Sequence, residues 1–452
     1  GDARLSKGPQ NFEQVLLQGL APNGGLYVPQ SLPQINPDSL KDRAYTRVAE
    51  EIMFPFVEGC IDRTDFRRII EDTYNSKIFQ GDEIAPLRHL NSRLSVLELF
   101  HGPTLAFKDY ALQLLGRLFD HVLEKRGENI TIVGATSGDT GSAAIEGCRH
   151  SKHAKIFILH PHGRVSAVQR RQMTTIDAPN VHNIAIEGTF DDCQNLVKAM
   201  FADEAFRKKL NLSAVNSINW ARIMAQIVYY FYAALQFEVP VSFVVPTGNF
   251  GNVLAGYYAR KMGAPIKSLT VASNRNDILT RFFERGKMYG EPVTPTLSPS
   301  MDIQISSNFE RYLFDLLGRD AAQLNKLMKQ FRKENRFKIE PDVLKAAQRD
   351  FHAARADDTR TLETIRAIYK EYGYILDPHS AVGMAAALKK EGREPVITLA
   401  TAHPAKFPDA VEKAIGMRPA LPTHLTDLMQ KKEHVTVLPN DLKTVQNHIL
   451  HS

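Results

Sequence analysis

Cysteine is scarce in this sequence. The three cysteines, Cys60, Cys148 and Cys193, are far apart, odd in number and form no CxxC pair. This spacing argues against a cysteine zinc site, and it favours a reducing compartment over an oxidising one, where disulfides persist. The sequence also opens without the apolar core of a signal peptide. We therefore expect a cytoplasmic protein with no metal site.

Long apolar runs are lacking too. The longest nearly apolar stretch, residues 224–237, is interrupted by Gln226 and Gln236, and it is shorter than the ~18–20 residues that a membrane-spanning helix requires. A large excess of charge of one sign is also missing, because 56 lysines and arginines balance 50 aspartates and glutamates to a net charge of +6. Such a small excess does not point to nucleic-acid binding, and a small anionic substrate fits it equally well. We thus expect neither a membrane nor a nucleic acid as partner.

The rest of the composition is that of an ordinary globular protein, with 43% apolar and 23% charged residues. Short β-branched and apolar runs alternate with amphipathic segments along most of the chain. The runs predict buried parallel strands, because their apolar residues are continuous instead of alternating; they lie at 130–133, 156–159, 182–186, 241–245, 269–271 and 396–399. Helical periodicity predicts helices at 110–125, 143–150, 192–209, 220–236 and 253–262.

This alternation predicts an α/β fold with a doubly wound sheet. Residues 1–95 form a separate N-terminal unit, in which the Gly- and Pro-rich stretch 19–33 predicts turns around a short strand and 45–60 predicts a helix. Residues 96–301 form the α/β core. The charge-rich, strand-poor stretch 302–374 predicts a helical insertion, after which 375–452 returns to the core and ends in a C-terminal tail.

A glycine-containing loop, VPTGNFGN at 245–252, follows one predicted strand and opens a predicted helix. Glycines there let backbone amides turn inward, and the helix N-terminus adds the positive end of its dipole, so the loop suits a phosphate. It is neither a GxGxxG fingerprint nor a Walker loop. A tight turn without a ligand explains this loop equally well when it is considered alone.

A second loop of the same kind, GATSGDTG at 134–141, follows another predicted strand. Its three hydroxyls and its glycine amides suit a carboxylate or a phosphate. The alternative is a capped helix with no ligand, in which Asp139 or Thr140 is the N-cap. Two such junctions at the carboxyl ends of strands favour a ligand site at that edge of the sheet.

Lys108 is the second-last residue of the segment HGPTLAFKD, 101–109, just before the predicted helix 110–125. Helix N-termini favour anions, so a lysine is unusual there. The helix dipole and burial would both lower its pKa, and a neutral amine is the better nucleophile and base, as a Schiff-base lysine requires. The alternative is a surface lysine whose stem packs on apolar groups, which spacing alone favours.

Five motifs together resemble those of the threonine synthases. They follow one another in the family's order over essentially the whole chain, and a sixth segment, GLAPNGGLYVP at 19–29, resembles the start of the extra N-terminal domain of the long bacterial and fungal type. The five motifs are HGPTLAFKD at 101–109, ATSGDTG at 135–141, NSIN at 216–219, PTGNFGN at 246–252 and TAHPAKF at 401–407.

The resemblance implies a pyridoxal-phosphate enzyme of fold type II, built like the tryptophan synthase β chain, with two subdomains in its α/β core. Lys108 matches the lysine that joins the cofactor, and Thr401 matches the residue near the pyridine nitrogen. The loop that holds the cofactor phosphate matches Gly248, Asn249, Phe250, Gly251 and Asn252. Many relatives have aspartate at the last of these positions, so a carboxylate role there is not carried over.

Two groups of substrate ligands also follow from the resemblance. The substrate carboxylate is expected at Thr136, Ser137, Asp139 and Thr140. The substrate phosphate is expected at Asn216, Ser217, Asn219 and Arg222. Two anionic groups on one small substrate would explain why two polar loops accompany the cofactor loop.

The reaction implied is O-phospho-L-homoserine plus water giving L-threonine plus phosphate, the last step of threonine biosynthesis. One alternative is a related phospho-lyase that releases 2-oxobutyrate. An alternative of another class is an inactive binding relative, against which the intact Lys108 and the intact loops argue. Monomer and dimer both remain open.

Overall fold

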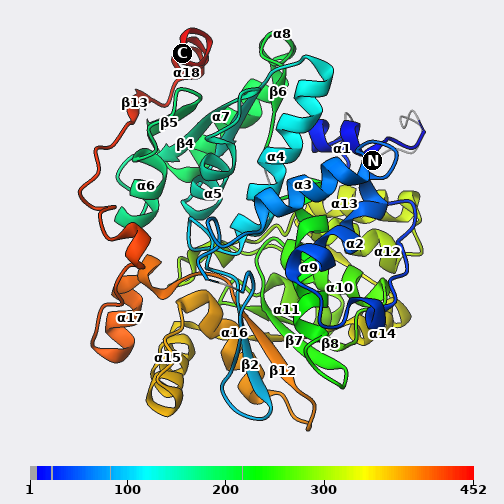
Figure 1. Ribbon diagram of the computed structural model, residues 1–452. Helices are drawn as coiled ribbons and strands as arrows, with labels where there is room; N and C mark the ends of the chain where they lie inside the picture. The colour runs from blue at the N-terminus through cyan, green and yellow to red at the C-terminus, as the bar shows by residue number, and fades with distance from the viewer. Residues whose placement is uncertain (1–7, 22–23, 82, 216) are drawn as a thin grey trace.

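Two sheets with helices on both faces make up most of the molecule (Figure 1). The structure is a computed structural model that describes residues 8–21, 24–81, 83–215 and 217–452. The larger sheet contains, in spatial order, β1 (Leu87–His89), β2 (Leu94–Glu98), β12 (Val396–Ala400), β7 (Val241–Pro246), β8 (Ile266–Ser273) and β11 (Phe351–Arg355). The smaller sheet contains β13 (Thr436–Pro439), β5 (Val181–Glu187), β4 (Ala154–Pro161), β3 (Ile130–Ala135) and β6 (Leu212–Ser213).

Every neighbouring pair in these two sheets is parallel except β1 with β2. The predicted doubly wound α/β class is therefore confirmed, and so are all six predicted strands, which are β3, β4, β5, β7, β8 and β12. A separate antiparallel pair joins β9 (Lys287–Tyr289) to β10 (Arg336–Lys338). The short strands at the sheet edges escaped prediction because they have too few residues for an apolar run to stand out.

The helices pack in three groups. Around the smaller sheet lie α5 (Asp139–Cys148), α6 (Ala167–Thr174), α7 (Phe190–Ala202), α8 (Glu204–Lys209) and α18 (Leu442–His451). Around the larger sheet and between the sheets lie α4 (Lys108–Arg126), α9 (Trp220–Ala234), α10 (Gly251–Lys261), α11 (Ile278–Arg285), α15 (Asp358–Tyr372), α16 (Pro378–Lys389) and α17 (Pro408–Ile415). At the side lie α12 (Phe309–Leu316), α13 (Ala321–Glu334) and α14 (Pro341–Asp350) (Figure 1).

The N-terminal unit is helical, with α1 (Phe12–Gln18), α2 (Tyr45–Val57) and α3 (Arg63–Thr73). The helix expected at 45–60 is confirmed as α2. The short strand expected within 19–33 is wrong, because no strand occurs in the described part of that stretch. Part of its backbone bonds to another element instead, since the carbonyl oxygen of Tyr27 accepts from Arg311 Nε at 2.8 Å.

The stretch 302–374 is mostly helical, as expected, but it is not free of strands. It contains β10, and it supplies β11 to the edge of the larger sheet beside β8. This stretch is therefore continuous with the core. The division into 1–95, 96–301, 302–374 and 375–452 stays a prediction.

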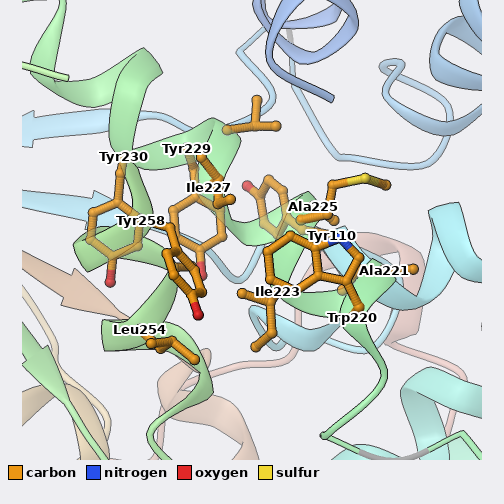
Figure 2. Packing of buried hydrophobic residues seen from close by; sticks show 14 of the residues in the cluster. Tyr110, Trp220, Ala221, Ile223, Ala225, Ile227, Tyr229, Tyr230, Leu254 and Tyr258 are labelled. Carbon is orange, nitrogen blue, oxygen red and sulfur yellow. The ribbon is translucent and has the colours of Figure 1, made fainter. Parts of the chain in front are cut away.

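The central core packs the two sheets together through α9 and its neighbours α2, α4 and α10. All residues of α9 except Tyr232 are buried. Figure 2 shows its aromatic side chains among those of the other helices: Trp220 meets Tyr258 edge-on at 5.6 Å, and Tyr229 meets Tyr110 at 5.7 Å between ring centroids. Aromatic contacts of this kind hold α9 in place, so the backbone from which the side chains at its start project is also held in place.

No helix in the part of the chain that the structure describes is both long and apolar enough to cross a membrane.

Two further apolar clusters cover the outer faces of the sheets. One joins α15 and α16 to the larger sheet, and the other joins α7 and α18 to the smaller sheet.

Candidate active site

A pocket lies at the carboxyl ends of β7 and β12, where α4, α9 and α10 begin. It is the edge at which a doubly wound sheet places ligand contacts. Among the predicted residues, the pocket is lined by Lys108, Thr140, Ser217, Arg222, Gly248, Asn249, Phe250, Gly251, Asn252 and Thr401. The fold therefore brings together most of the predicted site.

Lys108 is the first residue of α4, and the loop before it is fixed by hydrogen bonds. Thr104 donates to the carboxylate of Asp109 through its backbone N–H at 2.9 Å and its hydroxyl at 2.6 Å. A Cβ at Gly102 would lie 2.5 Å from Asp109, so only glycine fits there. The N–H of Phe107 donates to the carbonyl oxygen of Thr401 at 2.9 Å. The loop thus joins α4 to β12 and directs Lys108 into the pocket.

The pKa of Lys108 lies below its ordinary value, as the sequence predicts. Burial is the largest cause, because it disfavours the charged amine. Asp139, whose Oδ2 lies 3.2 Å from Lys108 Nζ, opposes this effect, whereas the positive charges of Lys406 and Arg222 add to it. The pocket therefore holds an amine that loses its proton more readily than an exposed lysine.

The loop 246–252 presents its amides to the pocket, because its carbonyls are bound elsewhere. The carbonyl oxygen of Gly248 accepts from Ser306 Oγ at 2.8 Å, and that of Asn249 accepts from Asn308 N at 3.1 Å. The amides of residues 248–251 donate to no backbone group within the described ranges. They lie at the start of α10, where the helix dipole is positive, so the loop fits a phosphate group.

Phe250 adopts a left-handed backbone, with φ of 64°, directly before α10. Such a conformation costs energy for a residue with a side chain. Its ring is buried against Phe309 at 5.1 Å and Phe351 at 5.3 Å between centroids, and this burial offsets the cost. The aromatic residue therefore holds the loop in its open conformation.

Asn252 and Arg222 place unpaired donors beside this loop. Asn252 Oδ1 accepts from the hydroxyls of Tyr229 at 2.7 Å and Tyr230 at 2.9 Å, so its Nδ2 is left buried without a partner among the described residues. Arg222 is 4% exposed, and its Nη1 has no partner in that part of the chain either. Burial lowers the pKa of Arg222 to about 10. Buried donors without acceptors fit an anionic ligand.

The loop 134–141 behaves differently, because one of its own side chains binds its amides. Thr136 Oγ1 accepts from the N–H of Gly138 at 3.0 Å and of Gly141 at 2.9 Å. The N-cap of α5 is Gly138, without a side-chain cap, so the alternative interpretation, with Asp139 or Thr140 as the N-cap, is wrong. Ser137 is exposed. Thr140 lines the pocket, whereas the Asp139 carboxylate is bound by Lys108 and by other buried donors.

The segment 216–219 lies at the start of α9. Asn216 falls outside the described residues. Ser217 lines the pocket, and its hydroxyl lies 3.3 Å from that of Ser307. Asn219 is fully buried as the N-cap of α9: it accepts from Ala221 N at 3.1 Å and donates to the carbonyl oxygen of Leu16 at 2.9 Å. Asn219 thus anchors the segment and does not line the pocket.

Thr401 follows β12, and its backbone is bound on both sides. Its N–H donates to Ser380 Oγ at 3.1 Å, and its carbonyl oxygen accepts from Phe107. These bonds hold its side chain at the pocket wall.

Four pocket residues outside the predicted motifs were missed by sequence reasoning: Gln226, Ser300, Met301 and His379. Ser300 and Met301 lie in a short 3-10 helix, Pro299–Met301, that follows no strand, so no strand-to-helix junction marks it. His379 sits at the start of α16, where its Nδ1 lies 2.7 Å from Asp377 Oδ2 and its Nε2 accepts from Ser300 N at 3.2 Å. The only signal in the sequence was the Asp-Pro pair that opens this helix.

These features define the chain as a pyridoxal-phosphate enzyme of fold type II. The family model "Pyridoxal-phosphate dependent enzyme" matches residues 80–325. Maize serine racemase, with 14% identity and a TM-score of 0.50 over 70% of this chain and 87% of its own, shares the fold. The amine of Lys108, the open amides of 248–251 and the unpaired Asn252 Nδ2 fit an aldehyde cofactor that carries a phosphate.

More specific similarities cover nearly the whole chain. Models of the threonine synthase N terminus and C-terminal region match residues 2–74 and 380–449. The threonine synthase of Pseudomonas aeruginosa is 56% identical over 96% of this chain and 94% of its own. The crystal structure of PLP-bound threonine synthase from Brucella melitensis is 52% identical, with a TM-score of 0.96 over 99% of this chain and 97% of its own. The yeast threonine synthase structure is 40% identical, with a TM-score of 0.93 over 98% of this chain and 96% of its own. This chain belongs to the threonine synthase family.

Proposed function

We propose that this protein converts O-phospho-L-homoserine and water into L-threonine and phosphate. The observation that carries the proposal is Arg222, a buried guanidinium without a carboxylate partner in the described residues, in the pocket that also holds Lys108 and the open amides of 248–251. The amides suit one phosphate, and the guanidinium suits a second anionic group. A substrate that carries its own phosphate matches this pair.

Lys108 is proposed as the residue that holds the cofactor and moves the protons. When bound, pyridoxal phosphate supplies an electron sink for negative charge that develops on the substrate. The amine of Lys108, with its pKa lowered chiefly by burial, accepts the α proton and returns a proton later. Asp139 Oδ2 lies 3.2 Å from Nζ and stabilises the charged form between these transfers.

The remaining cofactor contacts are proposed at the loop and at Thr401. The amides of 248–251 and Asn252 Nδ2 would hold the phosphate, and the Thr401 hydroxyl would serve the pyridine nitrogen. A hydroxyl there donates a hydrogen bond without delivering a full charge to the ring. Met301 and Phe107 add apolar surface to the pocket wall, which disfavours water beside the reacting atoms.

The substrate contacts are proposed at two walls of the pocket. Arg222, Ser217 and Ser307 bind the substrate phosphate, because the two hydroxyls lie together and the guanidinium lines the same pocket. The hydroxyl of Thr140, which lines the pocket at the start of α5, binds the substrate carboxylate. Asp139, expected in that role, instead positions Lys108.

Product analysis tests the proposal. Purified protein with pyridoxal phosphate and O-phospho-L-homoserine should release threonine and phosphate in equal amounts. Release of 2-oxobutyrate without threonine would identify a phospho-lyase instead. Borohydride reduction followed by peptide mapping should place the pyridoxyl label on Lys108; the absence of both label and product would identify a binding protein.

We further propose that the protein acts in the cytoplasm on this small molecule alone, without nucleic acid or membrane. The scarcity of cysteine and the small net charge of +6 support this. Sedimentation of the purified protein distinguishes monomer from dimer, and a gel-shift titration with mixed DNA and RNA at moderate salt should show no complex.

A further inference from the structure

A second buried lysine lies beside Lys108. Lys406 ends a 3-10 helix, Pro404–Lys406, directly after β12, and its side chain is 0% exposed. Its Nζ lies 2.7 Å from Asp139 Oδ1 and donates to the carbonyl oxygen of Thr104, also at 2.7 Å. The other oxygen of Asp139 lies 3.2 Å from Lys108 Nζ. Asp139 therefore bridges two lysines, with one on each carboxylate oxygen.

Two further donors complete the environment of this carboxylate. Gln169 Nε2 donates to Oδ1 at 2.8 Å, and Ser300 Oγ donates to Oδ2 at 3.4 Å. Burial alone would raise the pKa of Asp139, but Lys108 and Lys406 together lower it well below its ordinary value. Asp139 is thus a buried carboxylate that stays ionised.

One lysine alone could not keep Asp139 in this state through a reaction. A buried carboxylate loses its counter-charge whenever its single partner gives up a proton, and an uncompensated buried charge is very costly. Lys108 must be neutral to attack an aldehyde or to accept a proton. Lys406 does not line the pocket, so it takes no part in these proton transfers and stays bound to Asp139 Oδ1.

We propose that Lys406 is a positioning residue that keeps Asp139 charged and fixed, so that Lys108 can lose its proton under working conditions. The inference rests on the proposed function only in taking Lys108 as the lysine that binds the cofactor.

The charges around Lys108 determine in which direction the loss of the Lys406 charge shifts the pKa of Lys108. Asp139 faces it from α5, Lys406 from the 3-10 helix Pro404–Lys406, and Arg222 from α9. Asp109, whose pKa burial raises to about 6, turns its carboxyl to Thr104. If Lys406 becomes neutral, Lys108 loses a repelling charge and becomes the sole cationic partner of Asp139. Both changes favour the charged amine, so the pH at which half of Lys108 is neutral must rise.

Capture of pyridoxal phosphate by the full-length protein, freed of cofactor, measures this pH. The protein is exposed briefly to pyridoxal phosphate at a series of pH values between about pH 6 and pH 10, the range in which a perturbed lysine titrates. Borohydride then traps the bound cofactor, and peptide mapping measures how much label is on Lys108. Lys406→Gln keeps donors for Thr104 and Asp139 but removes the charge. We expect its midpoint to rise by about one pH unit, which makes capture roughly tenfold slower below the midpoint.

Gln169→Leu is the matched control, because it removes a hydrogen bond from the same oxygen without changing charge. Its midpoint should stay at the wild-type value, and a shift as large as that of Lys406→Gln would overturn the proposal. An unchanged midpoint in Lys406→Gln would overturn it too.

A thermal melt of each variant checks folding, and Lys406→Met replaces Lys406→Gln if the latter does not fold. Asp139→Asn leaves both lysines without their carboxylate, so its midpoint must fall; a rise or no change there counts against the bridge. If wild-type label is found on a lysine other than Lys108, the assignment of the cofactor lysine fails first.

Discussion

The two glycine-containing loops at the carboxyl ends of the strands look alike in sequence, yet they use their backbone in opposite ways. In 134–141, the hydroxyl of Thr136 accepts two loop amides, and the pocket side is left with hydroxyls and a carboxylate that is already paired. In 246–252, neighbouring segments bind the carbonyls of Gly248 and Asn249, and the amides of residues 248–251 stay open. The first loop faces the pocket with side chains, whereas the second offers its backbone amides to an anion.

The threonine in each loop explains the difference. Thr136 lies where its oxygen can reach forward to Gly138 and Gly141. Thr247 turns its hydroxyl back to the carbonyl oxygen of Val245, at 2.7 Å, and so leaves the following amides alone. Glycines after a strand therefore do not by themselves identify a ligand loop; the acceptors inside the loop decide.

The largest effect is expected at the amine that lies between the two loops. Lys108→Ala removes the cofactor attachment and the proton carrier together, so turnover should fall by at least about 10³-fold, as expected for loss of a nucleophile and general base. Product release by the variant, measured with and without added methylamine, checks this. Activity within tenfold of wild type would show that another group carries the protons.

The next effect is expected in the open loop. Gly248→Val places a Cβ 2.8 Å from the carbonyl oxygen of Ser300 and blocks the approach to the amides, so cofactor affinity should fall by about 100-fold, comparable to losing charge-assisted hydrogen bonds. Equilibrium dialysis measures affinity, and thermal unfolding of the cofactor-free protein measures stability. Gly251→Ala, whose Cβ would lie 3.2 Å from Asn308 Nδ2, should lose less affinity. A loss of stability with unchanged affinity would make these glycines purely structural.

In the loop 134–141 we expect the opposite result, a loss of stability instead of a loss of cofactor affinity. Thr136→Val leaves two buried amides without their acceptor, so the free energy of unfolding should fall by about 1–3 kcal/mol, while cofactor affinity changes little. Thr247→Val is the matched control, because its hydroxyl binds only a carbonyl that lies within a strand. Denaturant unfolding of both variants makes the comparison. Equal losses in the two would mean that the loops do not differ as described.

The smallest effect is expected at Arg222, which lies beside the loop 246–252 in the same pocket. Arg222→Lys keeps the charge but loses the two-point fork for a phosphate, so KM for phosphohomoserine should rise about tenfold, the range of a lost charged hydrogen bond, with a smaller change in kcat. Steady-state kinetics and a thermal melt check this. If stability drops and KM does not move, Arg222 supports the fold and not the substrate.

Much of the fold could be predicted because continuous apolar runs mark buried parallel strands, as at 241–245 and 396–399. The loops at the ends of those strands could also be found, since a sheet gathers its strand ends at one edge. Lys108 stood out by its position at a helix start, and the structure supplies the physical cause, since burial is the main reason that its pKa is low.

The remainder depends on contacts between distant segments. Nothing near Asp139 in the sequence indicates that Lys406 binds it, and nothing near Ser217 indicates Ser307. Asn219 was expected as a ligand because it lies in the NSIN motif that resembles the family, but a side chain that caps a helix and binds the carbonyl oxygen of Leu16 is already occupied. Spacing reports which residues are neighbours along the chain, and tertiary packing decides which of them stay unpaired.

The position of β12 has a consequence for how the protein is made. This strand lies between β2 and β7 in the larger sheet, and β13, still later in the chain, completes the smaller sheet beside β5. A ribosome that synthesises the chain from its N-terminus must therefore release nearly all of it before either sheet has all of its strands. Until then the nascent polypeptide exposes unpaired strand edges, which attract other chains. A premature stop before residue 396 would yield an aggregating fragment and no smaller enzyme.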